Sequence, residues 1–341
     1  MNASSPESAP SVPQSVPMVA LYPMVSRAVY AVVSLGIPDL LKNGSRSSSD
    51  LAVVLDVKAR PLHQILRTVA TTGLLKTEPN GKFALTDDGR CLLEEHPSSS
   101  RDFILTAGGP AWYNGLGAIV ESLKTGRTGF EITAGAPAFA FYGTHPEEAA
   151  SFNRMMIAAH AGEPQAVVEA YDFGRVEHIV DVGGGIGTFL SNVLGATPTA
   201  RGTLFDLPHA VEGARQVLGG SPVADRCSFV EGDFFAQVPA GDVHILSHVI
   251  HDWDDAESVK ILTNCQASLN PDGRILVVEA ILPDDDEPHP FKTLDVVLAT
   301  LAGGSERTMK EFTDLFDSAG LQINDVIPTK SAVSVIELQP R

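Results

Sequence analysis

A glycine-rich loop is the first part of this chain whose residues suggest chemistry. Asp181 and Val182 end a short apolar segment and lead directly into Gly183-Gly184-Gly185-Ile186-Gly187, after which the residues from Thr188 can continue as a helix. Glycine lets backbone approach a ligand closely, so a strand, a glycine loop and a helix in this order indicate a nucleotide-type site. The spacing Gly183, Gly185, Gly187 does not fit the dinucleotide pattern G-x-G-x-x-G, which disfavours NAD.

Two further segment ends complete a site for an adenosine. Asp206 ends the next apolar segment about 20 residues beyond the glycines, where a carboxylate can accept hydrogen bonds from both ribose hydroxyls. Asp233 and Phe234 follow the third segment and offer a carboxylate for the adenine amino group and an aromatic face for its ring. Any one acidic strand end is explained as well by a solvated loop, but the three together are not. Both NAD and S-adenosylmethionine contain a ribose whose hydroxyls need such an acidic acceptor.

His251 is the candidate base. It follows the fourth apolar segment by a few residues, so we expect it at the carboxyl edge of a parallel sheet, where open α/β folds bind ligands. An imidazole with an ordinary pKa near 6.5 suits a base at neutral pH. A single histidine is more often structural, and its position alone leaves both interpretations open.

Strands and helices that would position these residues alternate from His178 onward, which predicts a parallel sheet with helical crossovers. The expected strands are His178–Val182, Gly202–Phe205, Cys227–Val230, Val243–Leu246 and Ile275–Val278. Helices are expected over Asp254–Leu269, which a turn at Asn270–Gly273 closes, and over Met309–Ser318. Leu321–Ile327 and Ala332–Leu338 are expected to pair as an antiparallel edge hairpin.

Residues 18–96 predict a winged helix, because helical segments are followed by a hairpin signal at Asn80-Gly81. Most winged helices bind DNA, but a formal net charge of -18 removes the cationic term that dominates such affinity. We therefore expect no nucleic-acid partner and a homodimer formed through the apolar helix Met18–Val33.

Composition limits the remaining possibilities. Residues 1–17 are rich in Ser and Pro and lack the features of a signal peptide, so a disordered tail is expected. No apolar run reaches the roughly 20 residues that cross a bilayer, and the expected location is cytoplasmic. The three cysteines, Cys91, Cys227 and Cys265, are too far apart in sequence for a zinc motif and are expected to be reduced thiols.

Residues 97–172 form the helical connection between the two predicted domains. Aromatic residues occur there, which fits a substrate-pocket wall; for any one of them a place in the core is the alternative. They include Trp112, Tyr113, Phe139, Phe141, Tyr142 and Phe152.

Five short motifs carry a resemblance to a known family: Val180–Gly187, Phe205–Pro208, Gly232–Phe235, His251–Asp255 and Glu306–Thr308. From about Met18 to its end the chain resembles dimeric small-molecule O-methyltransferases that use S-adenosylmethionine, which include plant caffeic acid and flavonoid enzymes and bacterial natural-product tailoring enzymes. The resemblance implies an α/β class I methyltransferase domain over residues 173–341, with a Rossmann-like sheet and an antiparallel edge hairpin. It also implies that the N-terminal, mainly helical winged-helix domain is a dimerisation domain.

The resemblance implies a set of cofactor contacts. S-adenosyl-L-methionine would be the methyl donor and S-adenosyl-L-homocysteine the product, with contacts at Gly183, Gly185, Asp206, Leu207, Asp233, Phe234, Ser247 and Trp253. Many members of the family carry a lysine four residues before the catalytic histidine. Here that position is Ser247, whose hydroxyl retains a hydrogen bond but no charge.

The same resemblance implies that His251 takes the proton from a hydroxyl of a small, aromatic acceptor. Glu279 and Glu306 match the carboxylates that flank this base, and a carboxylate that accepts the far ring N–H would fix the tautomer. The alternatives are a solvated strand end for Glu279 and a salt bridge to Arg307 for Glu306.

Tyr142, Phe152 and Met156 are implied to line the acceptor pocket. No predicted helix carries an i, i+4 histidine pair, and no compact group of ligating residues stands out in the sequence, so we expect no metal and a metal-independent mechanism. Three alternatives remain: a C- or N-methyltransferase on the same scaffold, a cofactor-binding protein that has lost methyl transfer, and a DNA-binding regulator.

Overall fold

The computed structural model describes residues 16–341, which fall into two compact units that divide after Pro110. The predicted disordered tail lies outside the described residues, apart from Val16 and Pro17, which begin the first helix. Among the described residues we find no helix with the length and apolar character that crossing a membrane requires.

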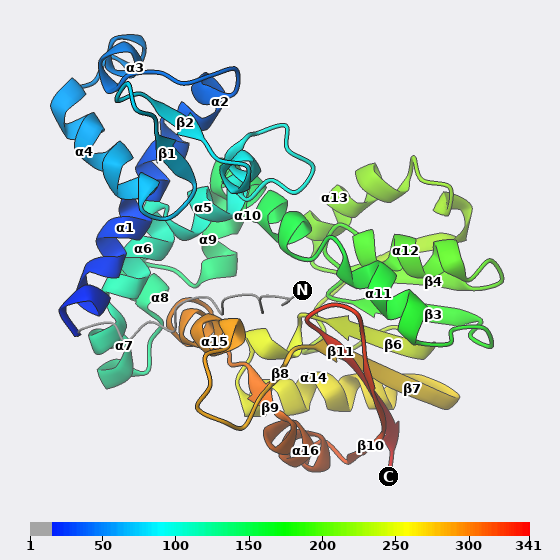
Figure 1. The fold of residues 1–341 in the computed structure, drawn as a ribbon. Coiled ribbons are helices and arrows are strands. Elements are labelled where there is room, and N and C mark those ends of the chain that lie inside the picture. Colours follow the sequence, from blue (N-terminus) through cyan, green and yellow to red (C-terminus); the bar gives the residue numbers. More distant parts are fainter. Residues whose placement is uncertain (1–15) are drawn as a thin grey trace, which may run out of the picture. The chain divides into compact units, whose positions relative to one another are not determined.

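The first unit consists of helices followed by a small hairpin (Figure 1). Its elements are α1 (Val16–Ser34), α2 (Ile37–Leu41), α3 (Ser48–Leu55), α4 (Ala59–Ala70), β1 (Leu75–Thr77), β2 (Phe83–Leu85), the 3-10 helix η1 (Asp88–Leu92) and α5 (Arg101–Ala107). Ser47 caps α3 by accepting the backbone N–H of Asp50, and Leu75 lies opposite Leu85 in the antiparallel hairpin. These elements confirm the predicted order of a winged helix.

Helices continue into the second unit before the sheet begins. They are α6 (Pro110–Gly117), α7 (Ile119–Thr125), α8 (Gly129–Ala134), α9 (Ala138–Thr144), α10 (Pro146–Ala159) and α11 (Glu163–Ala170). The predicted helical connection over residues 97–172 is thus shared: α5 belongs to the first unit, and α7 to α11 belong to the second.

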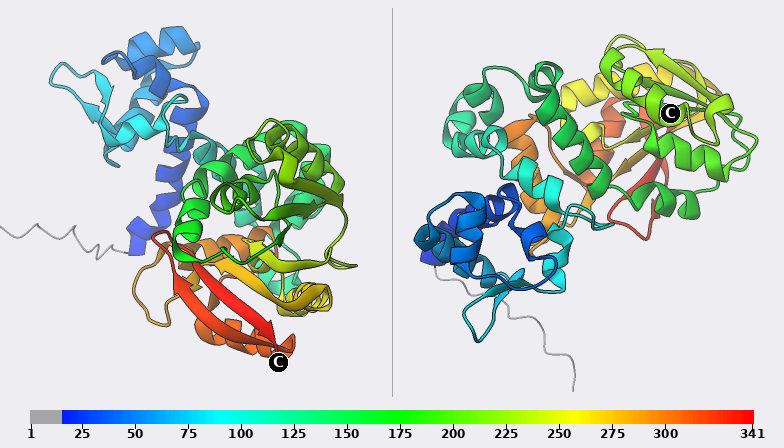
Figure 2. Two further views of the ribbon diagram at one scale, coloured as in Figure 1. Left: turned by 90° about the vertical axis from the view of Figure 1, so that its right-hand side faces the viewer. Right: turned by 90° about the horizontal axis from the view of Figure 1, so that it is seen from above.

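A seven-stranded sheet in the order β10-β11-β7-β6-β3-β4-β5 forms the centre of the second unit. Its strands are β3 (His178–Val182), β4 (Arg201–Asp206), β5 (Cys227–Glu231), β6 (Gly241–Ser247), β7 (Leu269–Glu279), β10 (Leu321–Pro328) and β11 (Ser334–Pro340). The neighbouring strands β7, β6, β3, β4 and β5 are parallel to one another. Strand β11 pairs antiparallel with both β7 and β10. This confirms the predicted edge hairpin, which is the red pair in Figure 2 (left).

Helices cover both faces of the sheet. They are α12 (Thr188–Ala196) and α13 (Pro208–Leu218) with α11 on one face, and α14 (Asp255–Ala267) and α16 (Met309–Ser318) on the other. Successive strand residues point to opposite faces, so Ile179 packs into the core beneath α11 to α13 and Val180 into the core beneath α14 and α16. The central strands β3, β4, β6 and the second half of β7 are buried on both faces, which explains their continuous apolar sequence.

Shorter elements connect these layers: the 3-10 helices η2 (Ala224–Arg226) and η3 (Ile250–Asp252), the parallel pair β8 (Ile281–Leu282) and β9 (Arg307–Thr308), and α15 (Pro290–Leu301). One sequence expectation was wrong. The residues Asn270–Gly273 lie within β7, not in a turn that precedes it, because the strand already pairs with β6 at Leu269. Asp272 takes a left-handed φ of 64° where the register between the two strands shifts.

Candidate active site

A cavity of about 390 Å³ lies in the second unit at the carboxyl ends of β3, β4 and β6, a volume in the usual range of roughly 300 to 1,000 Å³ for small-molecule sites. Eight of the residues predicted to bind cofactor or acceptor line it: Gly183, Gly185, Asp206, Leu207, Ser247, Tyr142, Phe152 and Met156. The cavity thus brings together residues from three strand ends and from α9 and α10.

The glycine loop forms one wall and needs glycine for two reasons. Gly183 and Gly185 adopt left-handed φ angles of 69° and 56°. A Cβ atom on Gly183 would lie 2.9 Å from a methyl carbon of Val249, and one on Gly184 would lie 2.7 Å from the carboxyl group of Asp181. Side chains are therefore excluded here, and the backbone is open to a ligand.

Asp206 ends β4 and braces this loop. One carboxylate oxygen accepts the N–H of Gly185 at 2.8 Å, and the other accepts the N–H of Leu207 at 2.6 Å. Burial raises the pKa of Asp206. Each oxygen keeps a lone pair, so Asp206 can hold the loop and still accept from a ligand.

Asp181 stands behind the loop. Its side chain is buried, lines the cavity, and has an oxygen, Oδ2, without a hydrogen-bond partner among the described residues. Burial, together with the nearby charge of Asp206, raises the pKa of Asp181 to about 7. A buried acceptor without a donor indicates a place where a bound ligand supplies one.

An aromatic wall forms another part of the cavity lining. Tyr142 stacks on Phe152 with ring centroids 4.7 Å apart, and its hydroxyl accepts the indole N–H of Trp112 at 2.8 Å. Met156 lies one helical turn beyond Phe152 on α10. These flat and flexible apolar side chains form a surface suited to an aromatic ligand.

Six of the predicted site residues do not line the cavity: Asp233, Phe234, Trp253, His251, Glu279 and Glu306. The ring of Phe234 comes within 3.7 Å of the Cβ position of Gly183, and it meets Trp253 edge-on with centroids 5.7 Å apart. Asp233 is exposed and accepts the N–H of Phe235 at 2.8 Å. Phe234 therefore lies beside the glycine loop with Trp253 packed against it, whereas the carboxylate of Asp233 closes a turn.

His251 is buried in η3, directly beyond the end of β6, between two carboxyl groups. Its Nδ1 lies 3.1 Å from Oε1 of Glu306 and 3.5 Å from Oε2 of Glu279. The Nδ1–H donates to Glu306, which leaves the lone pair on Nε2. Oε1 of Glu279 accepts the backbone N–H groups of Ile250 and His251 at 3.0 and 3.3 Å, so this carboxyl fixes the backbone that carries the histidine.

Burial determines the charge states of these three groups. It lowers the pKa of His251, so the ring is neutral and able to accept a proton near pH 7. Burial, with the charge of Glu306, raises the pKa of Glu279 well above its ordinary value. The pKa of Glu306 rises to about 7, also through burial.

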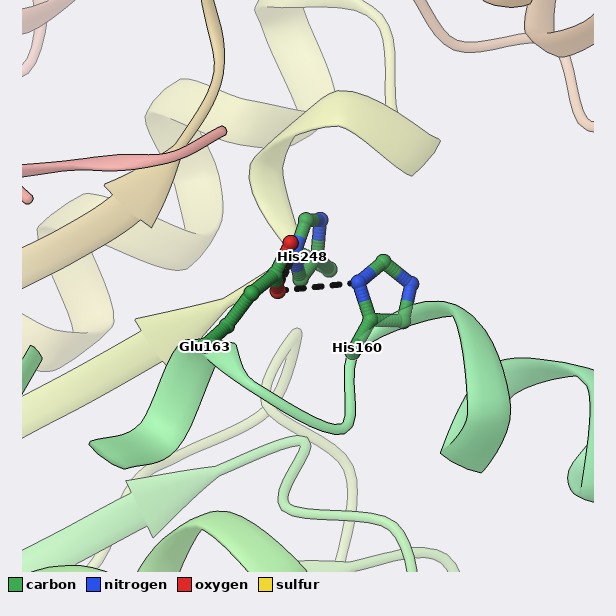
Figure 3. A group of neighbouring side chains, drawn as sticks. All are labelled: His160, Glu163 and His248. Carbon is green, nitrogen blue, oxygen red and sulfur yellow. Dashed lines mark hydrogen bonds and ion pairs between the residues drawn. The ribbon is translucent and has the colours of Figure 1, made fainter. Parts of the chain in front are cut away.

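A second group of ionisable side chains lies on the cavity wall: His160, Glu163 and His248 (Figure 3). Glu163 Oε2 lies 2.9 Å from Nδ1 of His160 and 2.6 Å from Nε2 of His248. Burial opposes ionisation of Glu163, but the hydrogen bonds from the two histidines outweigh it and lower the pKa to about 2. Burial lowers the pKa of His248 to about 4, so its ring is neutral and donates through Nε2–H to the Glu163 carboxylate.

These ligand-type atoms lie within 4.8 Å of one another, as do those of His248, His251 and Glu279. The expectation that the chain has no compact group of ligating residues was therefore wrong, because β6 brings His248 beside residues distant in sequence. The oxygen-to-nitrogen distances of 2.6 and 2.9 Å in the first group are hydrogen-bond distances. Neighbouring ligands on a tetrahedral zinc ion lie about 3.3 Å apart, so the geometry favours hydrogen bonds.

Comparison with protein families identifies both units. An O-methyltransferase domain matches residues 113–322, and an O-methyltransferase dimerisation domain matches residues 19–95. The chain belongs to the family of dimeric, S-adenosylmethionine-dependent small-molecule O-methyltransferases. It is an enzyme of that class, and its fold is the class I methyltransferase fold with an N-terminal dimerisation domain.

Three relatives show the range of this O-methyltransferase family. Phenazine O-methyltransferase PhzM of Lysobacter antibioticus is 38% identical, with 93% of each chain covered. The 8-amino-8-demethylriboflavin N,N-dimethyltransferase of Streptomyces davaonensis is 31% identical, with 92% of this chain and 91% of that protein covered.

A solved structure is the third. The O-methyltransferase NcsB1 of neocarzinostatin biosynthesis, in complex with S-adenosylmethionine and 2-hydroxy-5-methyl naphthoic acid, is 28% identical and superposes with a TM-score of 0.83 over 94% of this chain and 96% of that one.

From sequence alone, no role was assigned to several ionisable residues that line this O-methyltransferase cavity: His160, Glu163, Asp181, His248 and Asp252. Two signals could have found some of them. Phe152, Met156 and His160 recur at intervals of four, the spacing of one helix face, and Asp252 directly follows His251. No local sequence pattern connects Glu163 with His248, because only the fold brings the start of α11 next to the end of β6.

The raised pKa of Glu279 generates a stability prediction. Between its ordinary value and its folded value, the folded state binds a proton that the unfolded state has lost, so stability falls as pH rises through this window. Glu279→Gln removes this titration and keeps an oxygen for the two backbone N–H groups. We expect the variant to gain stability relative to the parent from pH 5 to pH 8, measured as the difference in Tm.

Glu169→Gln is the control, because Glu169 is an exposed carboxylate paired with Lys330. An equal Tm difference at every pH for Glu279→Gln would show that Glu279 is ionised in the folded enzyme.

Proposed function

We propose that this O-methyltransferase methylates a hydroxyl group of a small aromatic metabolite and that His251 removes the hydroxyl proton. The observation that carries the proposal is the position of His251, whose Nδ1 faces Glu306 and whose backbone is held by Glu279. S-adenosylmethionine supplies an electrophilic methyl group, so the chain has to align an oxygen with that group and take its proton.

The cavity wall around the glycine loop supports binding of this donor. The loop excludes side chains at Gly183 and Gly184, Asp206 lines the cavity where ribose hydroxyls need an acceptor, and Asp181 has a buried oxygen free to accept. We assign the cofactor to this wall and the acceptor to the aromatic wall formed by Tyr142, Phe152 and Met156.

The proton then has a defined route. It moves from the acceptor hydroxyl to Nε2 of His251, while Nδ1–H stays directed at Glu306. The carboxyl group of Glu306 stabilises the imidazolium that forms, and Glu279 fixes the backbone that carries the ring by accepting the N–H groups of Ile250 and His251.

An amine acceptor is the second candidate, favoured by the similarity to the N,N-dimethyltransferase. A neutral amine attacks without prior loss of a proton, so the dependence on a base would be weaker. Mass spectrometry and NMR of the methylated product distinguish oxygen, nitrogen and carbon as the site of methylation.

The role of His251 predicts that binding and chemistry respond differently to mutation. His251→Ala should bind S-adenosylhomocysteine as the parent does and lose about 100-fold or more in single-turnover methyl transfer. The single-turnover activity of Glu279→Gln should lie between that of the parent and that of His251→Ala. Activity of the parent should rise with pH through the titration of His251, below its ordinary pKa because burial lowers it, and the variant should lack this rise.

His96→Ala, in the first unit, is the control for this experiment and should keep full activity. Undiminished single-turnover methylation by His251→Ala would mean that alignment alone drives the transfer, and the proposed base would have to be abandoned.

The role of Asp206 predicts a loss of cofactor affinity. Asp206→Ala removes the acceptor that braces Gly185 and, by the proposal, receives the ribose hydroxyls. Hydrogen bonds to charged groups contribute about 1.5 to 3 kcal/mol, so S-adenosylhomocysteine should bind about 10- to 100-fold more weakly by calorimetry. Asp225→Ala changes an exposed acid and serves as the control; equal affinity in both variants would contradict the assignment of Asp206.

Helix α1 supports a homodimer whose partner helps to close the acceptor pocket. Val19, Leu21, Tyr22 and Met24 are large apolar residues that are exposed in the single chain, within the segment that matches the dimerisation domain. Light scattering should give twice the chain mass for the parent, and Leu21→Glu with Met24→Glu should give monomers with reduced activity. Leu123→Glu, on the exposed surface of α7, should stay dimeric; a fully active monomer would refute the shared pocket.

A further inference from the structure

The acceptor wall has a polar end that the proposed chemistry does not use. Phe152, Met156 and His160 recur at intervals of four along α10 and its C-cap, so they lie on one face, and all three line the cavity. The first two residues offer apolar surface. His160 offers an imidazole that is 28% exposed, on the same face.

Glu163 fixes the tautomer of this imidazole. Because Glu163 is ionised, Nδ1 of His160 must donate across the 2.9 Å contact, which leaves the lone pair on Nε2. Figure 3 shows the Nδ1 edge of the ring turned toward Glu163 and the opposite edge turned away from it. Nε2 has no hydrogen-bond partner among the described residues, so it is available to a ligand in the cavity.

His248 in turn holds Glu163. Its Nε2 donates to the same oxygen, Oε2, at 2.6 Å, and its ring lies 3.9 Å from that of His160. His248 has a φ of 53°, a left-handed conformation that few non-glycine residues adopt. Two donors on one carboxylate oxygen leave Glu163 little freedom to rotate away from His160.

We propose that His160 is an acceptor-binding residue that accepts a hydrogen bond through Nε2 from a second donor group of the acceptor, a hydroxyl or N–H next to the group that is methylated. Glu163 is the positioning residue that holds the His160 ring. The preferred substrates are then aromatic rings with two neighbouring donor groups. A carboxylate at the second position is disfavoured, because Glu163 is itself negative and lies on the same wall. This inference rests on the proposed aromatic acceptor, but not on the role of His251.

Binding to the dimer saturated with S-adenosylhomocysteine tests the inference without any methyl transfer. The probes are 2,3-dihydroxynaphthalene, 2-naphthol and 3-hydroxy-2-naphthoate, and their Kd values are measured by calorimetry. The parent should bind the diol about 10-fold more tightly than 2-naphthol, the effect of one hydrogen bond in a cavity. His160→Leu should lose this preference by weakening the diol alone.

Glu163→Gln provides a readout that a merely structural role would not give. The loss of the negative charge should weaken the diol by a few fold and tighten 3-hydroxy-2-naphthoate, whereas damage to the fold would weaken both. Glu169→Gln, also on α11 but paired with Lys330 at the surface, is the matched control and should change neither. His251→Ala should keep the preference for the diol, so the experiment separates a failure of the role of His160 from a failure of the role of His251.

Equal binding of the diol and 2-naphthol by the parent, or no binding of either, would overturn the inference. A preference for the diol that persists in His160→Leu would also overturn it. So would equal weakening of the diol and 2-naphthol in that variant.

Discussion

The site depends on one buried carboxyl group, that of Glu279. It ends β7 in the interior, and its Oε1 accepts two successive backbone N–H groups of the turn that follows β6. An unsatisfied buried carboxyl would be costly, so these hydrogen bonds effectively determine how the chain leaves β6. His251, its contact with Glu306 and the pocket-lining Asp252 all follow from the path of this turn.

Sheet topology supplies the rest of the site. Strands β4 and β5 lie on one side of β3, and β6 and β7 lie on the other, so the strand order reverses at β3. The crevice outside such a reversal is where open α/β sheets bind ligands. The glycine loop after β3, Asp206 after β4 and Ser247 at the end of β6 meet there, and each uses backbone or a short side chain, which leaves room for a ligand.

The sequence predicted most elements of the sheet because buried parallel strands are short, continuous apolar runs between polar turns. It also predicted that the ends of β3, β4 and β5 form one site and that His251 lies at the same carboxyl edge, since parallel strands share that edge. The cavity is lined from the ends of β3, β4 and β6, and Asp233 after β5 does not line it. The prediction from sequence was wrong for Asn270–Gly273, which are typical turn residues but lie within strand β7. The contact between Glu163 and His248 was not predictable either, because it joins residues far apart in sequence through side chains that carry no periodic signal. Asp233, which matched a family motif, closes a turn, since its carboxylate accepts from the residue two positions later.

A crystal structure of the enzyme with S-adenosylhomocysteine and a methyl acceptor bound tests the role of His251 without any kinetic measurement. If His251 is the base, the hydroxyl oxygen to be methylated lies within about 2.6 to 3.2 Å of its Nε2, with Nδ1 still directed at Glu306. An acceptor whose reactive oxygen is held by His160, with Nε2 of His251 out of hydrogen-bond reach, would contradict it and would make the pocket-facing histidine the base.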